Sequence, residues 1–320
     1  MIIQPEDSEN AVLDQLDEKY KQISQMSVKE RYFLNTLLQR YKPKKILEIG
    51  VFLGGSSIVI LNAIKDNPEA TLYSVDYLDS HGIADGKKTG YFVDEYPELK
   101  SKWRLYTGGL SCDFMDDIGE GIDFCFIDTM HYNPGEILDF LFALPFLKDD
   151  AVIVFHDTAL QTSNVLSNTN WSITNAMLIS AIYGTKLLQG NFSRASETDY
   201  PSVDGVTYMP NISGVVLEAE SRNRLYEIFN LLSIRWLYSP SKKEEAAILD
   251  YFKRFYNEFY VNFVKDIFVF ERMLIDYCDS RSPRRGIYNV LNRLLGRNVK
   301  IFIGKTLGKK LTQKLLRLFG

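Results

Sequence analysis

The sequence is poor in cysteine and has no long hydrophobic run. Only three of its 320 residues are cysteines, too few for a disulfide framework, and the odd count favours a reducing compartment. No window approaches the roughly 18 consecutive apolar residues of a membrane-spanning helix. The first residues lack the basic start and apolar run of a signal peptide. With 46% hydrophobic and 24% charged residues, disorder and collagen-like repeats are excluded. We therefore expect a folded, cytoplasmic protein.

Acidic residues are absent from the last forty positions. Residues 281–320 contain eleven Lys or Arg, so residues 1–280 keep 26 basic and 41 acidic side chains and a net charge of −15. Residues 287–319 alternate Ile, Leu and Phe with Lys and Arg, a basic amphipathic pattern suited to anionic lipid. This tail predicts peripheral contact with the inner membrane face. The alternative is docking on the acidic body of the same or a neighbouring subunit, as in a homo-oligomer. Nucleic acid is not expected, because the tail is mostly aliphatic and the body is acidic.

Short apolar runs alternate with helical patterns through the middle of the chain. Runs of this length between helices are typical of a parallel sheet covered on both faces. The pattern predicts a doubly wound α/β fold. The expected strands are 45–49, 72–75, 122–127, 151–155, 185–188 and 213–217, and the expected helices are 10–41, 56–64, 135–146 and 172–183.

Four segments follow from these patterns. They are an N-terminal helical segment (1–41), the α/β domain (42–240), an aromatic-rich helical region (241–286) and the basic tail (287–320). A long helix is expected over 242–277, packed on the sheet or in a dimer interface. Polar loops at 159–172 and 190–213 are the expected lid and substrate walls, and they carry Trp171, Tyr200 and Tyr208, which could stack on a sugar.

The first predicted strand runs into a glycine-rich turn. Gly50 and Gly54 permit a tight bend and close approach of a ligand, and a helix starting near Ser56 offers free N–H groups. The Gly-x-x-x-Gly spacing is neither a dinucleotide fingerprint nor a P-loop. Glu48 would repel a diphosphate and suits an ammonium or sulfonium ligand. A plain glycine-rich turn is the alternative.

An acid also follows the second predicted strand. Asp76 lies 26 residues after Gly50, where it could accept hydrogen bonds from ribose hydroxyls. An aspartate after a strand is often only a helix cap. The turn and this acid together favour a nucleoside ligand at the carboxyl edge of the sheet.

Four runs, ILEIGVFLGGSS, YSVD, IDFCFIDTMHY and AVIVFHDT, resemble those of class I S-adenosylmethionine-dependent methyltransferases. They are most similar to the branch of macrocin-type sugar O-methyltransferases and cephalosporin-hydroxylase-like proteins, over residues 30–218. The resemblance implies a Rossmann-like fold with a mostly parallel seven-stranded sheet and an added helical C-terminal region. It implies that S-adenosylmethionine is bound by Glu48, Gly50, Gly54, Ser56, Asp76, Ser111 and Asp128. Ser111 would lie near the adenine, although Leu110 replaces an acid that the family often has there.

The three histidines, His81, His131 and His156, each follow a predicted strand. Asp128 ends the fourth strand, and His156 and Asp157 end the fifth. Adjacent strand ends lie roughly 5 Å apart, so Asp128, His131, His156 and Asp157 could converge. The alternative is that the aspartates merely cap the following helices.

Two roles fit such a cluster. One is a divalent-ion site, since the metal-dependent O-methyltransferases hold their ion with residues that correspond to Asp128, His156 and Asp157. A histidine at 156 suits Mn²⁺ better than Mg²⁺. The other is general-base catalysis, with His131 removing the proton of a substrate hydroxyl and Asp128 beside it.

The leading interpretation is an S-adenosylmethionine-dependent O-methyltransferase that acts on a sugar, glycan or related small acceptor, with metal assistance as an option. Two alternatives stay open. One is a non-catalytic binding or assembly module on the same fold. The other is a nicotinamide-dependent oxidoreductase, which the glycine spacing and Glu48 disfavour.

Overall fold

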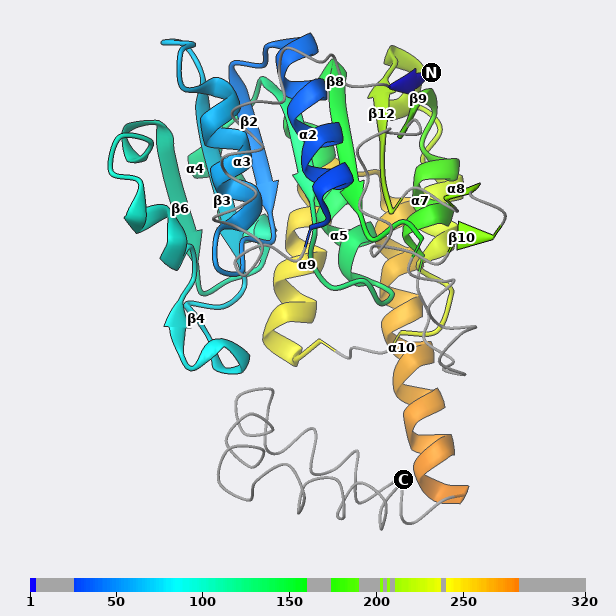
Figure 1. Cartoon of the computed structure of the whole chain (residues 1–320). Helices are drawn as coiled ribbons and strands as arrows, with labels where there is room; N and C mark the ends of the chain where they lie inside the picture. Colours follow the sequence, from blue (N-terminus) through cyan, green and yellow to red (C-terminus); the bar gives the residue numbers. More distant parts are fainter. Residues whose placement is uncertain are drawn as a thin grey trace.

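The computed structural model describes residues 1–3, 26–159, 174–189, 202–203, 206–207, 211–236 and 240–281. Its centre is a sheet in the order β1-β9-β12-β8-β7-β2-β3-β6 (Figure 1). Seven of these strands have five or more residues, and β1 is a two-residue edge strand. The strands are β1 (Ile2–Ile3), β2 (Lys45–Ile49), β3 (Thr71–Asp76), β6 (Trp103–Thr107), β7 (Ile122–Ile127), β8 (Leu147–His156), β9 (Gly184–Gln189) and β12 (Ile212–Leu217).

The strands from β6 to β8 are parallel, whereas β12 runs antiparallel to both of its neighbours, β8 and β9. In the registers, Ile49 pairs with Ile127, and Ile127 pairs with Phe155. The carboxyl ends of β2, β7 and β8 therefore lie side by side. This topology confirms the predicted doubly wound, mostly parallel sheet.

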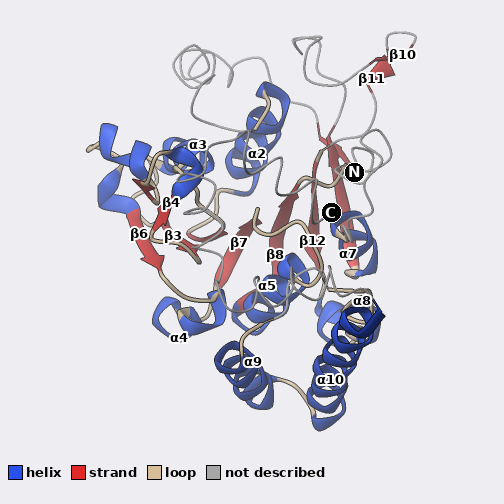
Figure 2. Ribbon diagram, turned by 90° about the horizontal axis from the view of Figure 1, so that it is seen from below, coloured by secondary structure: helices blue, strands red, loops and turns tan. Residues whose placement is uncertain are grey.

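Helices cover both faces of the sheet (Figure 2). Side chains alternate along each central strand, so that Ile46 and Phe124 face one core while Leu47 and Cys125 face the other. The first core includes α2 (Val28–Tyr41) and α3 (Gly55–Ile64). The second includes α4 (Met115–Ile118), α5 (Gly135–Ala143), α7 (Asn175–Ala181), α8 (Tyr226–Leu231), α9 (Lys242–Phe255) and α10 (Glu258–Arg281).

Short elements connect these layers. Two small hairpins pair β4 (Ser80–His81) with β5 (Lys87–Lys88), and β10 (Ser202–Val203) with β11 (Val206–Thr207). The 3₁₀ helices are η2 (Gly82–Ala84), η3 (Tyr91–Glu95), η4 (Lys100–Lys102), η5 (Ser111–Asp113), η6 (Leu144–Phe146) and η7 (Ala219–Arg222).

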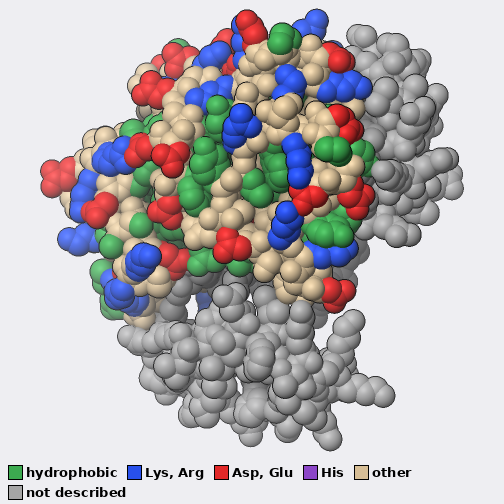
Figure 3. Space-filling view, turned by 90° about the vertical axis from the view of Figure 1, so that its left-hand side faces the viewer, with side chains coloured by type: hydrophobic (Ala, Val, Ile, Leu, Met, Phe, Trp, Pro, Cys, Tyr) green, Lys and Arg blue, Asp and Glu red, His purple; other side chains and the backbone are tan. Residues whose placement is uncertain are grey.

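Acidic and basic side chains are interspersed over the face of the molecule on the β6 side (Figure 3).

Two elements differ from the sequence-based expectation. Edge strand β6 was not predicted, because Arg104 and Leu105 are exposed and the strand has no continuous apolar run. The single helix expected over 242–277 is two helices, broken at Tyr256 and Asn257. Tyr256 has an extended backbone, and the side-chain oxygen of Asn257 accepts the backbone N–H of Tyr260, as a helix N-cap does.

The two C-terminal helices pack against α5 and α8 in the second core, on the side away from the sheet (Figure 2). The Phe252 ring is fully buried, the Tyr251 hydroxyl donates to the Phe142 carbonyl at 2.6 Å, and the Phe229 and Tyr260 rings stack at 4.2 Å. Trp171, Tyr200 and Tyr208, most of both predicted loops, residues 10–25 and the basic tail lie outside the described residues. Among the described helices, none is both long and apolar enough to cross a membrane.

Candidate active site

The glycine-rich turn after β2 is built against the end of β7. Gly50 has a φ of +94°, and a Cβ atom there would lie 1.8 Å from the carbonyl oxygen of Asp128. Gly54 has a φ of +92° and faces the side chain of Val93 and the backbone of Gly90. Only glycine fits both positions, and α3 begins directly afterwards without a side-chain cap on its first N–H groups. The bend therefore presents uncapped amides at the carboxyl edge of the sheet.

Asp76, the residue expected to bind ribose, also holds this bend. Its Oδ2 accepts the backbone N–H groups of Val51 and Phe52 at 3.0 and 2.9 Å, and its Oδ1 accepts that of Leu78 at 2.8 Å. Phe52 has a φ of +52°, which is unusual for a side chain of that size. The carboxylate stabilises the strained turn, a role that the sequence spacing alone did not indicate.

Glu48 lies under the bend and does not face the ligand side. Its side chain is 0% exposed, and both oxygens accept hydroxyl hydrogen bonds, from Ser56 at 2.6 Å, Ser57 at 2.7 Å and Ser74 at 2.6 Å. Burial raises the pKa of Glu48 to about 7. The Glu48 carboxylate thus ties β2, β3 and α3 together, and its contact with S-adenosylmethionine stays a prediction. The Ser56 hydroxyl is likewise engaged inside the protein, because it donates to this carboxylate.

Ser111 lies in η5 and reaches a carboxylate that the sequence analysis did not select. Its hydroxyl donates to Asp139 Oδ1 at 2.6 Å, and the Thr129 hydroxyl donates to Asp139 Oδ2 at 2.7 Å. Asp139 thereby joins the segment after β6 to the segment after β7, and burial raises its pKa to about 6. The signal available in the sequence was an acid between apolar residues in the middle of α5.

Asp128, His131 and Asp157 converge beside the bend. Each offers one ligand atom, and these three atoms all lie within 4.8 Å of one another. His131 Nε2 is 2.8 Å from Asp157 Oδ2, and His131 Nδ1 is 3.2 Å from Glu136 Oε1. The Asn211 side-chain amide donates to Asp157 Oδ1 at 2.8 Å. The structure brings these three predicted residues together at the ends of β7 and β8.

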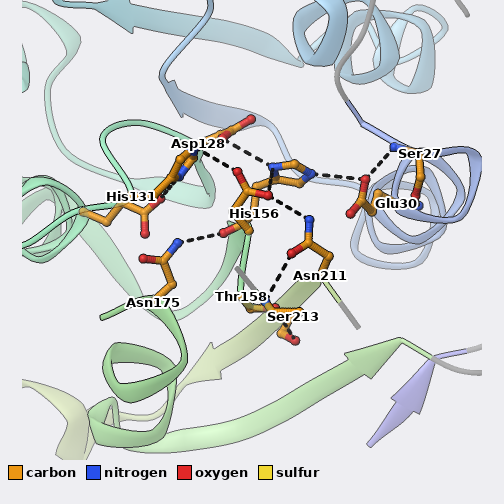
Figure 4. A network of polar contacts seen from close by, with 12 residues as sticks. Ser27, Glu30, Asp128, His131, His156, Thr158, Asn175, Asn211 and Ser213 are labelled. Carbon is orange, nitrogen blue, oxygen red and sulfur yellow. Dashed lines mark hydrogen bonds and ion pairs between the residues drawn. The ribbon is translucent and has the colours of Figure 1, made fainter. Parts of the chain in front are cut away.

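His156 belongs to the same network, and its ring lies between Asp128 and Glu30 (Figure 4). It is 4% exposed; Nε2 lies 3.2 Å from Glu30 Oε2, and Nδ1 lies 3.4 Å from Asp128 Oδ1 and 3.5 Å from Asp157 Oδ1. Both of its ring nitrogens face carboxylates, as those of His131 do. Among the described residues, the group that could hold a metal ion is Asp128, His131 and Asp157. A role for His156 as a metal ligand therefore stays a prediction.

The carboxylates make both imidazoles cationic. Burial lowers the pKa of His131, but hydrogen bonds and charges from Asp157 and Glu136 outweigh it and raise the pKa to about 10. Burial likewise opposes the charge on His156, yet Asp128, Asp157 and Glu30 raise its pKa well above the usual value. The carboxylates around both rings therefore favour the protonated imidazole.

The third histidine, His81, lies apart from this cluster. Its Nε2 is 3.1 Å from the Thr89 hydroxyl and 3.7 Å from Asp76 Oδ2, and its ring meets the Phe52 ring edge-on at 4.7 Å. His81 therefore packs beside the bend on the Asp76 side. Its position in the sequence predicted that His81 lies at the carboxyl edge of the sheet. It did not predict the contacts with Thr89, Asp76 and Phe52.

Residues 47–158 match the family model of a methyltransferase domain. The match covers β2 to β8 and includes the bend, Asp76 and the Asp128–Asp157 cluster. It confirms the expectation of a methyltransferase domain. A comparison with curated proteins found no match.

Several solved structures are similar in fold. An O-methyltransferase from Bacillus cereus in complex with SAH is 21% identical, with a TM-score of 0.44, and the alignment covers 67% of this chain and 93% of that one. A putative O-methyltransferase from Klebsiella pneumoniae is 17% identical, with a TM-score of 0.45 and coverages of 68% and 93%. TomG from Streptomyces achromogenes, in complex with SAM, is 15% identical, with a TM-score of 0.43 and coverages of 66% and 91%.

The burial of Glu48 predicts a pH-dependent stability. The folded state keeps the Glu48 proton up to about pH 7, whereas the unfolded chain releases it near pH 4.5, so raising the pH across this window weakens folding. Between pH 5 and pH 8 the wild type should lose about 2–3 kcal/mol of unfolding free energy relative to Glu48→Gln. Urea denaturation of both proteins at the two pH values measures the change.

Glu69→Gln is the matched control. Glu69 is an exposed carboxylate paired with Lys44, and that pairing lowers its pKa, so it is ionised throughout the window. The difference between the wild type and Glu69→Gln should stay nearly constant from pH 5 to pH 8. An equally constant difference for Glu48→Gln would contradict the prediction.

Proposed function

We propose that the chain is an S-adenosylmethionine-dependent O-methyltransferase that methylates a hydroxyl of a sugar, glycan or related small acceptor. The observation that carries the proposal is the convergence of Asp128, His131 and Asp157 beside the glycine bend within the methyltransferase domain. A cofactor site and a group of proton-transferring side chains then share one edge of the sheet. The sugar acceptor rests on the sequence resemblance.

The residues around the bend fit a cationic nucleoside. Gly50 and Gly54 leave room for a ligand at the backbone, and the amides at the start of α3 carry no side-chain cap. Asp76 has one acceptor position left on Oδ1 for a ribose hydroxyl after its three backbone contacts. Asp128 supplies negative charge on the sulfonium and ammonium side. Ser111 helps shape the adenine side through its bond to Asp139.

Asp128, His131 and Asp157 also fit a divalent ion. Two carboxylates and one imidazole are donors that Mn²⁺ accepts, and the span of 4.8 Å among their ligand atoms suits a single ion. Mg²⁺ prefers all-oxygen ligands and fits less well. When bound, the ion would lower the pKa of an acceptor hydroxyl.

His131 is the candidate base. The cofactor supplies the electrophilic methyl group, and the acceptor oxygen attacks it as the hydroxyl proton leaves. His131 starts as an imidazolium held between Asp157 and Glu136, and positive charge bound beside it lowers its pKa. It then releases its Nε2 proton to solvent, which leaves Nε2 free to accept the proton of the acceptor hydroxyl. This role and metal binding by the same nitrogen exclude each other, so the two are alternative uses of His131. Asp157 and Glu136 keep the ring oriented for this transfer.

The bend can be tested by paired glycine substitutions. Gly50→Ala places a methyl group against the Asp128 carbonyl, whereas Gly86 also has a positive φ, of +74°, but a Cβ atom there would meet nothing within 4 Å. Calorimetric titration with S-adenosylmethionine should show at least about tenfold weaker binding for Gly50→Ala, since a displaced bend loses ligand contacts. Gly86→Ala should bind like the wild type. Equal affinities for both variants would refute the assigned site.

The catalytic cluster can be tested by a methyl-transfer screen over sugar acceptors. His131→Ala should lower kcat by about 10² to 10⁴, the usual contribution of a general base. EDTA should lower the wild-type rate if a metal assists, and Mn²⁺ should restore it. Asp149→Asn, an exposed aspartate paired with Arg222, is the control and should keep the wild-type rate. Turnover by His131→Ala at the wild-type rate would exclude this residue as the base.

We also propose peripheral membrane contact through residues 287–320. Eleven basic residues and no acidic ones lie in 281–320. The helix leading toward this tail, α10, exposes Phe270 and Met273 by 53% and 64%. Such a combination of basic and exposed apolar side chains favours binding to anionic lipid.

The full chain should co-sediment with phosphatidylglycerol vesicles, more weakly at high salt, and not with phosphatidylcholine vesicles. Unchanged sedimentation after deletion of 287–320 would count against the tail.

A further inference from the structure

A helix outside the matched domain supplies a carboxylate to the back of the candidate active site. Glu30, in the first turn of α2, is 2% exposed, and its Oε2 lies 3.2 Å from His156 Nε2. The other ring nitrogen of His156 faces Asp128 and Asp157 at 3.4 and 3.5 Å. Figure 4 shows the imidazole between Glu30 on one side and Asp128 on the other.

This geometry makes His156 a bridge. Its Nε2 lies within 3.2 Å of the Glu30 carboxylate, and its Nδ1 lies within 3.5 Å of both Asp128 and Asp157, so the ring links the start of α2 to these two aspartates. Asp128 and Asp157 are two of the three residues whose ligand atoms converge at the reaction site. The direction in which those two carboxylates point therefore depends on where the His156 ring is held.

Glu30 is itself held rigidly. Its Oε2 accepts the Ser27 backbone N–H at 2.5 Å, and the Ser27 hydroxyl accepts the Glu30 N–H, which together form a capping box. The rest of α2 is anchored by buried Phe33, Leu34 and Leu37 in the core shared with α3. The carboxylate that meets His156 is thus fixed by a helix start and by packing.

We propose that Glu30 is a positioning residue of the transfer reaction, acting through His156 to orient Asp128 and Asp157. This inference rests on the proposed function. The first turn of α2 then contributes to the candidate active site, although α2 precedes residues 47–158, which match the family model. A merely structural role, in which Glu30 only caps α2, is the competing account.

Three single variants separate the two accounts. Glu30→Gln keeps a residue that completes a capping box but removes the charge facing His156. Ser27→Ala breaks the cap and keeps the charge. Glu271→Gln makes the same chemical change at another buried glutamate, one that accepts the Trp236 N–H at 3.1 Å.

The kinetic readout is kcat against cofactor affinity in the full chain. Glu30→Gln should lower kcat about tenfold to hundredfold, as loss of a supporting contact behind a reaction centre does, and leave S-adenosylmethionine affinity unchanged. Ser27→Ala should lower the melting temperature and keep kcat, and Glu271→Gln should keep kcat. Wild-type kcat in Glu30→Gln, or an equal loss in Ser27→Ala, would overturn the proposal.

A double-mutant cycle tests the route. If Glu30 acts through His156, Glu30→Gln should have no further effect on kcat in a His156→Gln background. Multiplied losses would show that Glu30 acts independently and would overturn the assignment. If His156→Gln does not fold, the three single variants decide the question.

Imidazole NMR separates this inference from the proposed function. The His156 ring ¹⁵N–¹H signals should shift in Glu30→Gln and not in Glu271→Gln. If the wild type binds no S-adenosylmethionine and transfers no methyl group, the proposed function fails while this measurement still tests the contact. Unshifted His156 signals in Glu30→Gln would overturn the positioning role even in an active enzyme.

Discussion

The contact between Gly50 and the backbone of Asp128 is the constraint on which the site depends. The absence of a side chain at Gly50 lets the turn after β2 lie directly against the end of β7. The Asp128 N–H donates to the Ile49 carbonyl at 2.9 Å, and the Gly50 N–H donates to the Val75 carbonyl at 2.8 Å. Three strand ends are thereby joined by main-chain bonds. The glycine bend and the Asp128 and Asp157 carboxylates consequently share one rigid edge.

Negative charge dominates this edge, and the protein distributes it in two ways. Glu48 and Asp139 are buried, which raises their pKa values to about 7 and 6, although hydroxyl donors stabilise their charged forms in part. Asp128 and Asp157 instead share the positive charge of His156, and Asp157 also that of His131. Buried charges persist only when they are paired in this way. The surplus of carboxylates is suited to a cationic ligand.

Much of this arrangement could be predicted from the sequence. Apolar runs of four to six residues identified six of the seven longer strands, and the strand-end positions of Asp128, His131 and Asp157 indicated their convergence. Edge strand β6 lacked the signal because its residues are half exposed. The partners of Glu48 and His156 could not be predicted, since the face on which a side chain points and the helix that covers it depend on packing between distant segments. Glu30, 126 positions before His156, is the clearest case.

The antiparallel direction of β12 divides the site between two parts of the chain. Because β12 enters the sheet beside the end of β8, Asn211 at its start reaches Asp157 and the backbone at Thr158 and Ala159. The glycine bend, by contrast, is assembled from β2, β3 and β7 together with the segment at Gly90 and Phe92, whose N–H groups donate to the Phe52 and Leu53 carbonyls. Substitutions around the start of β12 can therefore alter the Asp157 side of the cluster while the bend keeps its geometry.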